Sequence, residues 1–242
     1  MKTEDRIIYL LLSLIEELLH IAISVFCLLL LALSVYSLFD TANLYLDASR
    51  SSILRFRPEI EKENVNLYEE LKGSVSWLTL DGAGVDDPVM QGKDNLEYLN
   101  KNPYGEFSLS GSLFLDARNS PDFSDPYSLI YGHHMDHHMM FGALDQYMDE
   151  EFFESHTEGS LTVNGEVLQL EIFSVLICSA YERTVFEPGE SEGLRDYILQ
   201  NSKYLHEENW KEDERILAIS TCRYPDTEYR TVVFARIKDH ER

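Results

Sequence analysis

Two residues near the end of the chain, Cys222 and Arg230, have the types and the spacing for nucleophilic chemistry. The runs Ile216–Cys222 and Tyr229–Ile237 are apolar and rich in β-branched or aromatic residues, which predicts two strands joined by a polar turn. A hairpin would bring the thiol at the end of one strand close to the guanidinium at the start of the next. Because a permanent cation stabilises thiolate over thiol, the pattern indicates a cysteine nucleophile. The alternative is a buried structural cysteine with a surface arginine.

Four of the eight histidines lie in one short segment, His133-His134-Met135-Asp136-His137-His138. Their spacing of four residues would let a helix offer two imidazoles to Zn²⁺. Against this, Gly132 follows a predicted strand, so His133 lies at a strand end or turn, and the segment lacks the glutamate of an HExxH site. We therefore interpret one of these histidines as the acid/base beside Cys222, since imidazole titrates in the useful range. A metal site and solvent-exposed histidines are the alternatives.

A cysteine nucleophile that attacks a carbonyl also needs a group to stabilise the oxyanion, and Arg230 fits that role. A cysteine, a histidine and an arginine at three strand ends would make an acyl-transfer site. Asp226 could orient His133, although Pro225 and Asp226 fit a turn at least as well.

The composition excludes several classes of protein. The 43 acidic and 20 basic residues give a formal charge of −23, which argues against a nucleic-acid partner because phosphate binding needs clusters of Lys and Arg. The three cysteines, Cys27, Cys178 and Cys222, contain no CxxC pair, which excludes a disulfide framework and a zinc finger. Cys178 lies in a strand-like run, where its expected role is to fill the core.

One apolar run is long enough to cross a membrane. From Ile21 to Phe39 the chain carries no charge, and at about 1.5 Å per residue a helix here spans roughly 29 Å, close to the hydrocarbon thickness of a bilayer. A cleaved signal peptide fits less well because the run starts late and is long. Basic residues flank it on both sides, so they do not decide the orientation. The large domain that follows favours an extracellular position for that domain.

The remaining elements must position the candidate residues. Residues 40–72 suggest a linker that runs into a helix, and Gly73 ends it. Helical patches are expected at 140–153 and 191–205. An Asn164-Gly165 pair gives the strongest hairpin signal. Many short strands with few helices predict a closed barrel or a sandwich. Apart from the two runs above, the predicted strands are Val75–Leu80, Ser108–Asp116, Tyr127–Gly132, Ser160–Val163 and Glu166–Cys178.

The candidate residues lie in recognisable motifs. Ile219–Cys222, followed by Arg230, resembles the TLxTC…R signature of sortases, and Tyr131–Met135 looks like their GHxM-type histidine motif. Three further segments are similar to the class B branch of that family, namely Pro88–Asn95, Tyr98–Asn100 and Gly111–Asp116. The resemblance covers about residues 50–238, with the motifs in the same order.

The resemblance implies a mainly β fold, an eight-stranded sortase-type β-barrel with an N-terminal helical extension and a long helix before the strand that bears Cys222. It also implies a single-pass protein of a Gram-positive cell membrane with its catalytic domain outside. The expected organisation is an N-terminal cytoplasmic segment at 1–20, a transmembrane anchor at 21–39, a linker with N-terminal helices at 40–72 and the catalytic barrel at 73–242.

The implied activity is that of a cysteine transpeptidase. Cys222 would attack a Thr–Gly or similar bond of a C-terminal sorting signal, and an amine of a cell-wall precursor or a pilin lysine would resolve the thioacyl enzyme. This would serve cell-wall anchoring or pilus polymerisation. His133 is implied as the acid/base and Arg230 as the oxyanion-binding group. The implied substrate-binding residues are Ser220, Leu99 and Thr221.

The resemblance implies no cofactor and no metal. Two other functions remain in competition with it. A hydrolytic cysteine peptidase would differ only in using water to resolve the acyl enzyme, and an extracellular peptide-binding module would use the groove without chemistry. The presence of Cys222, His133 and Arg230 together argues against the second of these.

Overall fold

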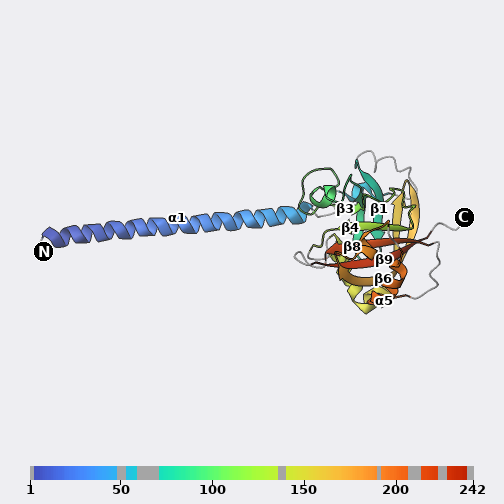
Figure 1. Cartoon of the computed structure of the whole chain (residues 1–242). Helices are drawn as coiled ribbons and strands as arrows, with labels where there is room; N and C mark the ends of the chain where they lie inside the picture. Colours follow the sequence, from blue (N-terminus) through green and yellow to red (C-terminus); the bar gives the residue numbers. More distant parts are fainter. Residues whose placement is uncertain are drawn as a thin grey trace. The chain divides into compact units, whose positions relative to one another are not determined.

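The computed structural model describes residues 3–47, 53–58, 71–135, 140–189, 192–206, 214–222 and 228–238. The chain divides into two compact units, Met1–Leu46 and Asp47–Arg242. The described part of the first unit is a helix, and the second unit contains the sheet (Figure 1).

A single helix, α1 (Thr3–Asp47), contains the predicted transmembrane run. Its segment Leu11–Asn43 is long and apolar enough to cross a membrane, and its side chains are exposed. Two hydroxyls inside it, those of Ser24 and Ser34, donate to the carbonyls four residues earlier at 2.8 and 2.9 Å. Such bonds keep hydroxyls paired where no water is present. The helix extends past both ends of 21–39 because no Gly or Pro interrupts it.

The region between the helix and the sheet differs in part from the expectation. The linker predicted from residue 40 begins later, since α1 continues to Asp47. A short 3₁₀ turn, η1 (Leu54–Phe56), follows, and the residues around it pack in a small cluster with Leu71 and Trp77. Most of the predicted N-terminal helix, residues 59–70, lies outside the described residues.

Eight strands of the described chain close into a barrel, which confirms the predicted mainly β fold. The ring order is β5-β1-β2-β3-β4-β8-β9-β6, and the β5–β6 hairpin closes it. The pairs β2–β3 and β4–β8 are parallel, and the other pairs are antiparallel. A ninth strand, β7, extends the sheet from β6. The bounds are β1 (Ser74–Leu80), β2 (Val85–Met90), β3 (Leu113–Leu115), β4 (Tyr127–Gly132), β5 (Glu158–Val163), β6 (Glu166–Ser179), β7 (Tyr204–Leu205), β8 (Arg215–Cys222) and β9 (Tyr229–Lys238).

Two hydrophobic layers explain why the strand before Cys222 is apolar at successive positions. Along β8, Leu217 and Ile219 belong to the cluster that fills the barrel. Their neighbours Ile216 and Ala218 point to the other face and pack in a second cluster, together with residues of α4 (Arg183–Phe186) and α5 (Leu194–Asn201). A strand buried on both faces gives a continuous apolar run, because successive side chains alternate between the faces.

The helix before the cysteine-bearing strand is shorter than predicted. Helix α5 covers eight residues, Leu194–Asn201, instead of 191–205. Gly193, with φ +85°, has a left-handed conformation that cannot continue the helix toward the N-terminus. At the other end the Lys203 N–H donates to the Val175 carbonyl at 2.8 Å, and the next two residues pair with β6 as β7. A helix before the strand that ends in Cys222 is therefore present as expected, but within the described residues it is limited to Leu194–Asn201.

The helical patch predicted at 140–153 agrees better with the structure. The patch predicted at 140–153 contains a 3₁₀ helix, η3 (Phe141–Met148), and the start of α3 (Glu150–Ser155). Asp149 separates them and caps α3, since its side chain accepts from the Phe152 N–H at 3.0 Å. A further 3₁₀ turn, η2 (Glu97–Asn100), lies within the connection between β2 and β3.

Candidate active site

Two parallel strands bring the histidine and cysteine motifs to one edge of the barrel. In the register of β4 and β8, Tyr131 lies opposite Ser220 and Gly132 opposite Thr221. Parallel neighbours end at the same edge of a sheet, so His133, which follows β4, lies near the end of β8. The two motifs, far apart in the sequence, are adjacent for this reason.

The antiparallel neighbour β9 adds the arginine. Cys222 is the last residue of β8, and its register partner in β9 is Arg230. The predicted hairpin geometry, with a cysteine opposite an arginine, is therefore confirmed for the backbone. The side chain of Cys222 and the turn residues 223–227, including Pro225 and Asp226, lie outside the described residues.

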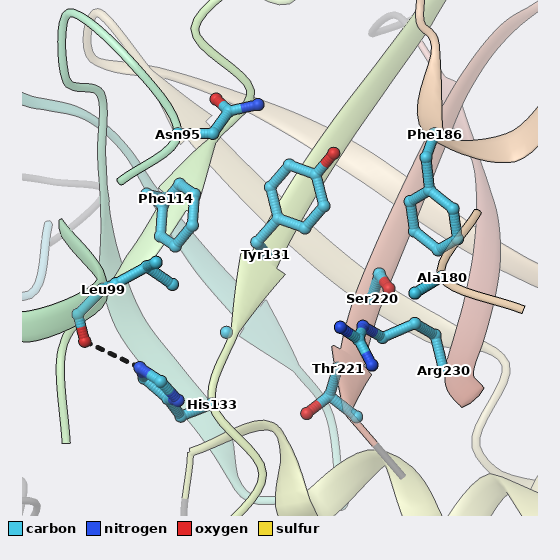
Figure 2. A pocket seen from close by; sticks show the side chains of 11 residues that line it. Asn95, Leu99, Phe114, Tyr131, His133, Ala180, Phe186, Ser220, Thr221 and Arg230 are labelled. Atoms are coloured by element: carbon cyan, nitrogen blue, oxygen red, sulfur yellow. Dashed lines mark hydrogen bonds between the residues drawn. The ribbon is translucent and has the colours of Figure 1, made fainter. Parts of the chain in front are cut away.

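A pocket of about 270 Å³ opens at this edge of the barrel (Figure 2). The structure brings together the predicted site residues other than Cys222 in its lining, namely Leu99, His133, Ser220, Thr221 and Arg230. Figure 2 shows His133 beside Leu99, and Arg230 among Ser220, Thr221 and Ala180. The location of these five residues around one cavity is consistent with the catalytic or substrate-binding role predicted for each of them.

The backbone of Leu99 orients His133. The Nε2 atom of His133 lies 2.7 Å from the Leu99 carbonyl oxygen. Because a carbonyl only accepts hydrogen bonds, Nε2 carries the proton in the neutral ring, and Nδ1 is then the nitrogen with a lone pair. The sequence predicted Leu99 as a groove residue, and the structure adds this contact with His133.

Gly111 makes the approach of this loop to the histidine possible. Its φ of +61° is one that L side chains rarely adopt. A Cβ atom at this position would lie 2.6 Å from the Leu99 carbonyl oxygen and 2.9 Å from Cδ2 of His133. A side chain here would therefore displace the hydrogen-bonded pair or the loop.

The second histidine of the cluster has a different environment. His134 Nε2 lies 2.8 Å from Asp145 Oδ2, and the imidazole is largely buried. The residue does not line the pocket, whereas His133 does. His137 and His138 lie outside the described residues.

Ser220 presents a polar atom to the pocket. The residue is 1% exposed, and its Oγ has no hydrogen-bond partner among the described residues. A buried hydroxyl without a partner costs free energy, which a ligand with a matching polar group would recover. The Arg230 side chain is half-buried, and its Nη1 donates to the Tyr229 carbonyl at 3.3 Å.

Part of the pocket wall consists of residues that sequence reasoning did not identify as site residues. The Tyr131 ring packs against those of Phe114 and Phe186, with centroids 5.3 and 6.4 Å away. Alternation along β4 could have indicated Tyr131, because it shares a face with Leu129. Phe186 comes from the short helix α4, which carries no motif. The lining residues missed in this way are Asn95, Phe114, Tyr131, Gly132, Ala180 and Phe186.

Burial and neighbouring polar groups shift the pKa values of Asp116 and Tyr131. Asp116 is fully buried, and burial would raise its pKa, but hydrogen bonds from Arg118 and Asn95 outweigh burial and hold the pKa below its ordinary value. Burial, together with the neighbouring Asp116 carboxylate, raises the pKa of Tyr131. Asp116 is thus a carboxylate and Tyr131 a neutral hydroxyl at neutral pH.

The second cysteine of the barrel unit, Cys178, has a buried thiol. Cys178 is 3% exposed and belongs to the outer hydrophobic cluster, as predicted for a core residue. Burial, and then the nearby Glu182, raises the pKa of its thiol to about 12, although Arg230 acts in the opposite direction. The thiol therefore remains protonated at neutral pH, and a protonated thiol is a poor nucleophile.

Comparisons with known proteins agree with this geometry. The family model described as "Sortase domain" matches residues 78–238. Sortase B of Listeria monocytogenes is 34% identical over 176 residues, 70% of each chain, and Sortase B of Staphylococcus aureus is 32% identical over 188 residues, 75% of each chain. The crystal structure of a Streptococcus pyogenes class B sortase involved in pilus biogenesis matches with a TM-score of 0.67 and 36% identity, over 73% of this chain and 100% of that chain. The chain therefore belongs to the sortase family, whose members are cysteine transpeptidases, and to its class B branch.

Proposed function

We propose that this sortase cleaves the C-terminal sorting signal of surface proteins at a Thr–Gly or similar bond and transfers the acyl group to an amine. The observation that carries the proposal is the pocket lined by both His133 and Arg230, at the edge of the barrel where Cys222 ends β8. A histidine and an arginine around one cavity beside a cysteine are the groups that acyl transfer through a thioester requires.

In the first half-reaction the Cys222 thiolate attacks the scissile carbonyl carbon, and a carbon–sulfur bond forms. The carbonyl oxygen becomes an oxyanion that the Arg230 guanidinium stabilises. When this intermediate collapses, the carbon–nitrogen bond breaks and the leaving amine takes a proton from the His133 imidazolium. The products are a thioacyl enzyme and a peptide with a free amine.

In the second half-reaction an acceptor amine attacks the thioester. The neutral His133 accepts the amine proton, the new amide bond forms and the Cys222 thiolate leaves. The bond from Nε2 to the Leu99 carbonyl supports this cycle, because that nitrogen donates in both the neutral and the charged ring. The proton would therefore be exchanged at Nδ1.

The other predicted residues would bind the peptide. Ser220 would offer its Oγ, which has no hydrogen-bond partner among the described residues, to a polar group of the substrate, and Leu99 would contact an apolar side chain. Thr221 lines the same cavity. We assign all three to substrate binding and none of them to proton transfer.

We further propose that the apolar part of α1 at 21–39 crosses the membrane, with residues 1–20 on the cytoplasmic side. The catalytic barrel at 73–242 would then be extracellular, together with the segment 40–72 before it, whose first residues belong to α1 as far as Asp47. The acceptor amine belongs either to a cell-wall precursor or to a pilin lysine. The similarity to a Streptococcus pyogenes sortase involved in pilus biogenesis supports a pilin partner.

Product analysis tests the proposal against its closest alternative. The full chain in detergent micelles would be incubated with candidate sorting-signal peptides, with and without triglycine as the acceptor amine. We expect a conjugate of the cleaved peptide with triglycine, lost in Cys222→Ala. Cleavage that gives only the free acid at every triglycine concentration would identify a hydrolytic peptidase. No cleavage, with a Cys222 that does not react with iodoacetamide, would identify a peptide-binding module.

A further inference from the structure

One buried carboxylate connects the separate parts of the pocket wall. Asp116 follows β3 directly and is 0% exposed. Its backbone N–H donates to the Leu129 carbonyl of β4 at 2.8 Å, which fixes the residue to the barrel. The two carboxylate oxygens accept bonds from three side chains, and none of these three has a role in the proposed proton transfer.

Two of these side chains line the pocket themselves. The Nδ2 of Asn95 donates to Asp116 Oδ2 at 2.8 Å, while its Oδ1 accepts from the Ala117 backbone N–H at 2.7 Å. Both ends of the amide are therefore assigned by their partners. The Tyr131 hydroxyl donates to the same Oδ2 at 3.0 Å, which holds the ring at the centre of the wall.

The third side chain, Arg118, extends the connection to helix α4. Its Nε and Nη2 donate to the two Asp116 oxygens at 2.8 and 2.7 Å. The same Nη2 donates to the Phe186 carbonyl at 2.7 Å. Bidentate bonds between a guanidinium and a carboxylate are among the strongest between side chains. Figure 2 shows Asn95, Tyr131 and Phe186, which come from the three connected segments, around the same cavity.

We propose that Asp116 is a positioning residue that sets how tightly the pocket binds its peptide, by fixing Asn95, Tyr131 and Phe186 relative to one another. The inference rests on the proposed function, since the wall matters only if a peptide occupies the pocket. Asp116 acts on binding and not on the chemical step, because its side-chain bonds lead to Asn95, Arg118 and Tyr131 and not to His133.

The substitution Asp116→Asn tests this with little change of shape. It replaces one acceptor oxygen by a donor nitrogen. At the Oδ2 position that nitrogen meets the Asn95 amide, whose orientation Ala117 fixes, and at the Oδ1 position it meets the Arg118 N–H groups. In either orientation a donor faces a donor, so at least one of the side-chain hydrogen bonds to residue 116 is lost. Tyr131→Phe removes a single link and leaves the ring in place.

The experiment measures acyl-enzyme formation against peptide concentration by intact mass spectrometry, on the full chain in micelles with the peptide that acylates the wild type. For Asp116→Asn we expect the half-saturating peptide concentration to rise about tenfold and the maximal rate to change less than about twofold. Tyr131→Phe should raise the same concentration about threefold. Asp122→Asn, the same change at an exposed position nearby, is the matched control and should match the wild type.

A second readout needs no peptide. Hydrogen exchange of the segment 183–187 should become faster in Asp116→Asn, because Arg118 loses its fixed position, and should stay unchanged in Asp122→Asn. A fall in maximal rate with an unchanged half-saturating concentration in both pocket variants would overturn the inference, as would unchanged exchange in Asp116→Asn. If the wild type forms no adduct with any peptide, the proposed function fails, and the exchange result alone decides whether Asp116 holds the wall.

Discussion

At the scale of single residues, the contact between His133 and the Leu99 carbonyl limits which ring nitrogen of His133 can exchange a proton. With Nε2 committed as a donor, Nδ1 is the atom that can exchange a proton with a substrate amine. His134, the adjacent residue, has the same side chain but pairs with Asp145. The sequence could identify a histidine cluster and favour His133 by its place after Gly132, but the partner of each ring depends on loops that are distant in the sequence.

The two neighbouring histidines give a matched pair of variants. We expect His133→Gln to slow acyl-enzyme formation at least about 100-fold, because the leaving amine loses its proton donor. His134→Gln keeps a hydrogen-bonding group for Asp145 and should retain most of the wild-type rate. Rates of adduct formation with a sorting-signal peptide provide the measurement. Equal losses in the two variants would contradict the assignment of His133.

The two cysteines of the barrel unit should differ in reactivity. Because the pKa of Cys178 is raised to about 12, its thiol is protonated at pH 8 and buried, so iodoacetamide should leave it unmodified in the native protein. Cys222, opposite Arg230, should be alkylated under the same conditions. Peptide mapping after alkylation, with and without urea, measures both sites. Native labelling of Cys178 at the rate of the unfolded chain would show that this thiol is not protected.

At the scale of elements, the hairpin of β8 and β9 was predictable because its strands are apolar, β-branched and separated by one polar segment. The hairpin at Asn164-Gly165 was predictable for a local reason as well, since both residues have positive φ, 50° and 84°, between paired strands. These elements depend on neighbours in the sequence. Their register then fixes Cys222 opposite Arg230.

Other elements depend on contacts that a sequence does not display. Strand β2 was missed because it contains Asp86, Asp87 and Pro88, which are unusual in strands. Asp86 is accommodated because it accepts hydrogen bonds from Trp77 and Thr79 of β1. The strand predicted at 108–116 is limited to Leu113–Leu115, since Ser108 and Ser110 bond to each other at 2.8 Å in a turn before it.

The loop that carries Leu99 can be tested through its glycines. Gly111→Ala places a Cβ against the Leu99 carbonyl and the His133 ring, and it adds the strain of a positive φ. Gly105→Ala has a similar φ of +83°, but its Cβ would meet no atom of the described residues within 4 Å. Each substitution should cost about 1–2 kcal/mol of folding free energy from strain alone.

Only Gly111→Ala should also move the His133 contact, and we expect its rate of acyl-enzyme formation to fall about tenfold or more. Urea unfolding reports the stability and mass spectrometry the rate. If Gly105→Ala loses as much activity as Gly111→Ala, the effect comes from strain in the loop and not from the contact with His133.

At the scale of the whole molecule, the chain has two units with different surfaces. The segment Leu11–Asn43 exposes apolar side chains along its length, whereas the barrel unit buries most of its hydrophobic residues in clusters, of which the two largest contact β8. The whole chain has a net charge of −23. The sequence predicted this division from charge and hydropathy. It did not predict how the barrel closes, because the order of eight strands depends on pairings between distant segments.

The division predicts how a shortened chain behaves. A chain that starts at Asp47 keeps every strand of the barrel and should be soluble without detergent. It should react with iodoacetamide at Cys222 at the rate of the full chain, while the full chain should partition into lipid vesicles. Sedimentation with vesicles and alkylation kinetics measure the two properties. Loss of cooperative unfolding in the shortened chain would show that the helix is needed for the barrel to fold.

The proposed reaction requires that Cys222 forms a thioester with a sorting-signal peptide, and intact mass spectrometry of the full chain with such peptides detects that adduct. We expect a mass gain equal to the acyl part of the peptide, mapped to Cys222, absent in Cys222→Ala and much reduced in His133→Gln. Hydroxylamine should remove the adduct, as it does for thioesters. An adduct that persists in Cys222→Ala, or a reactive Cys222 that no peptide with a cleavable sorting signal acylates, would contradict the claim.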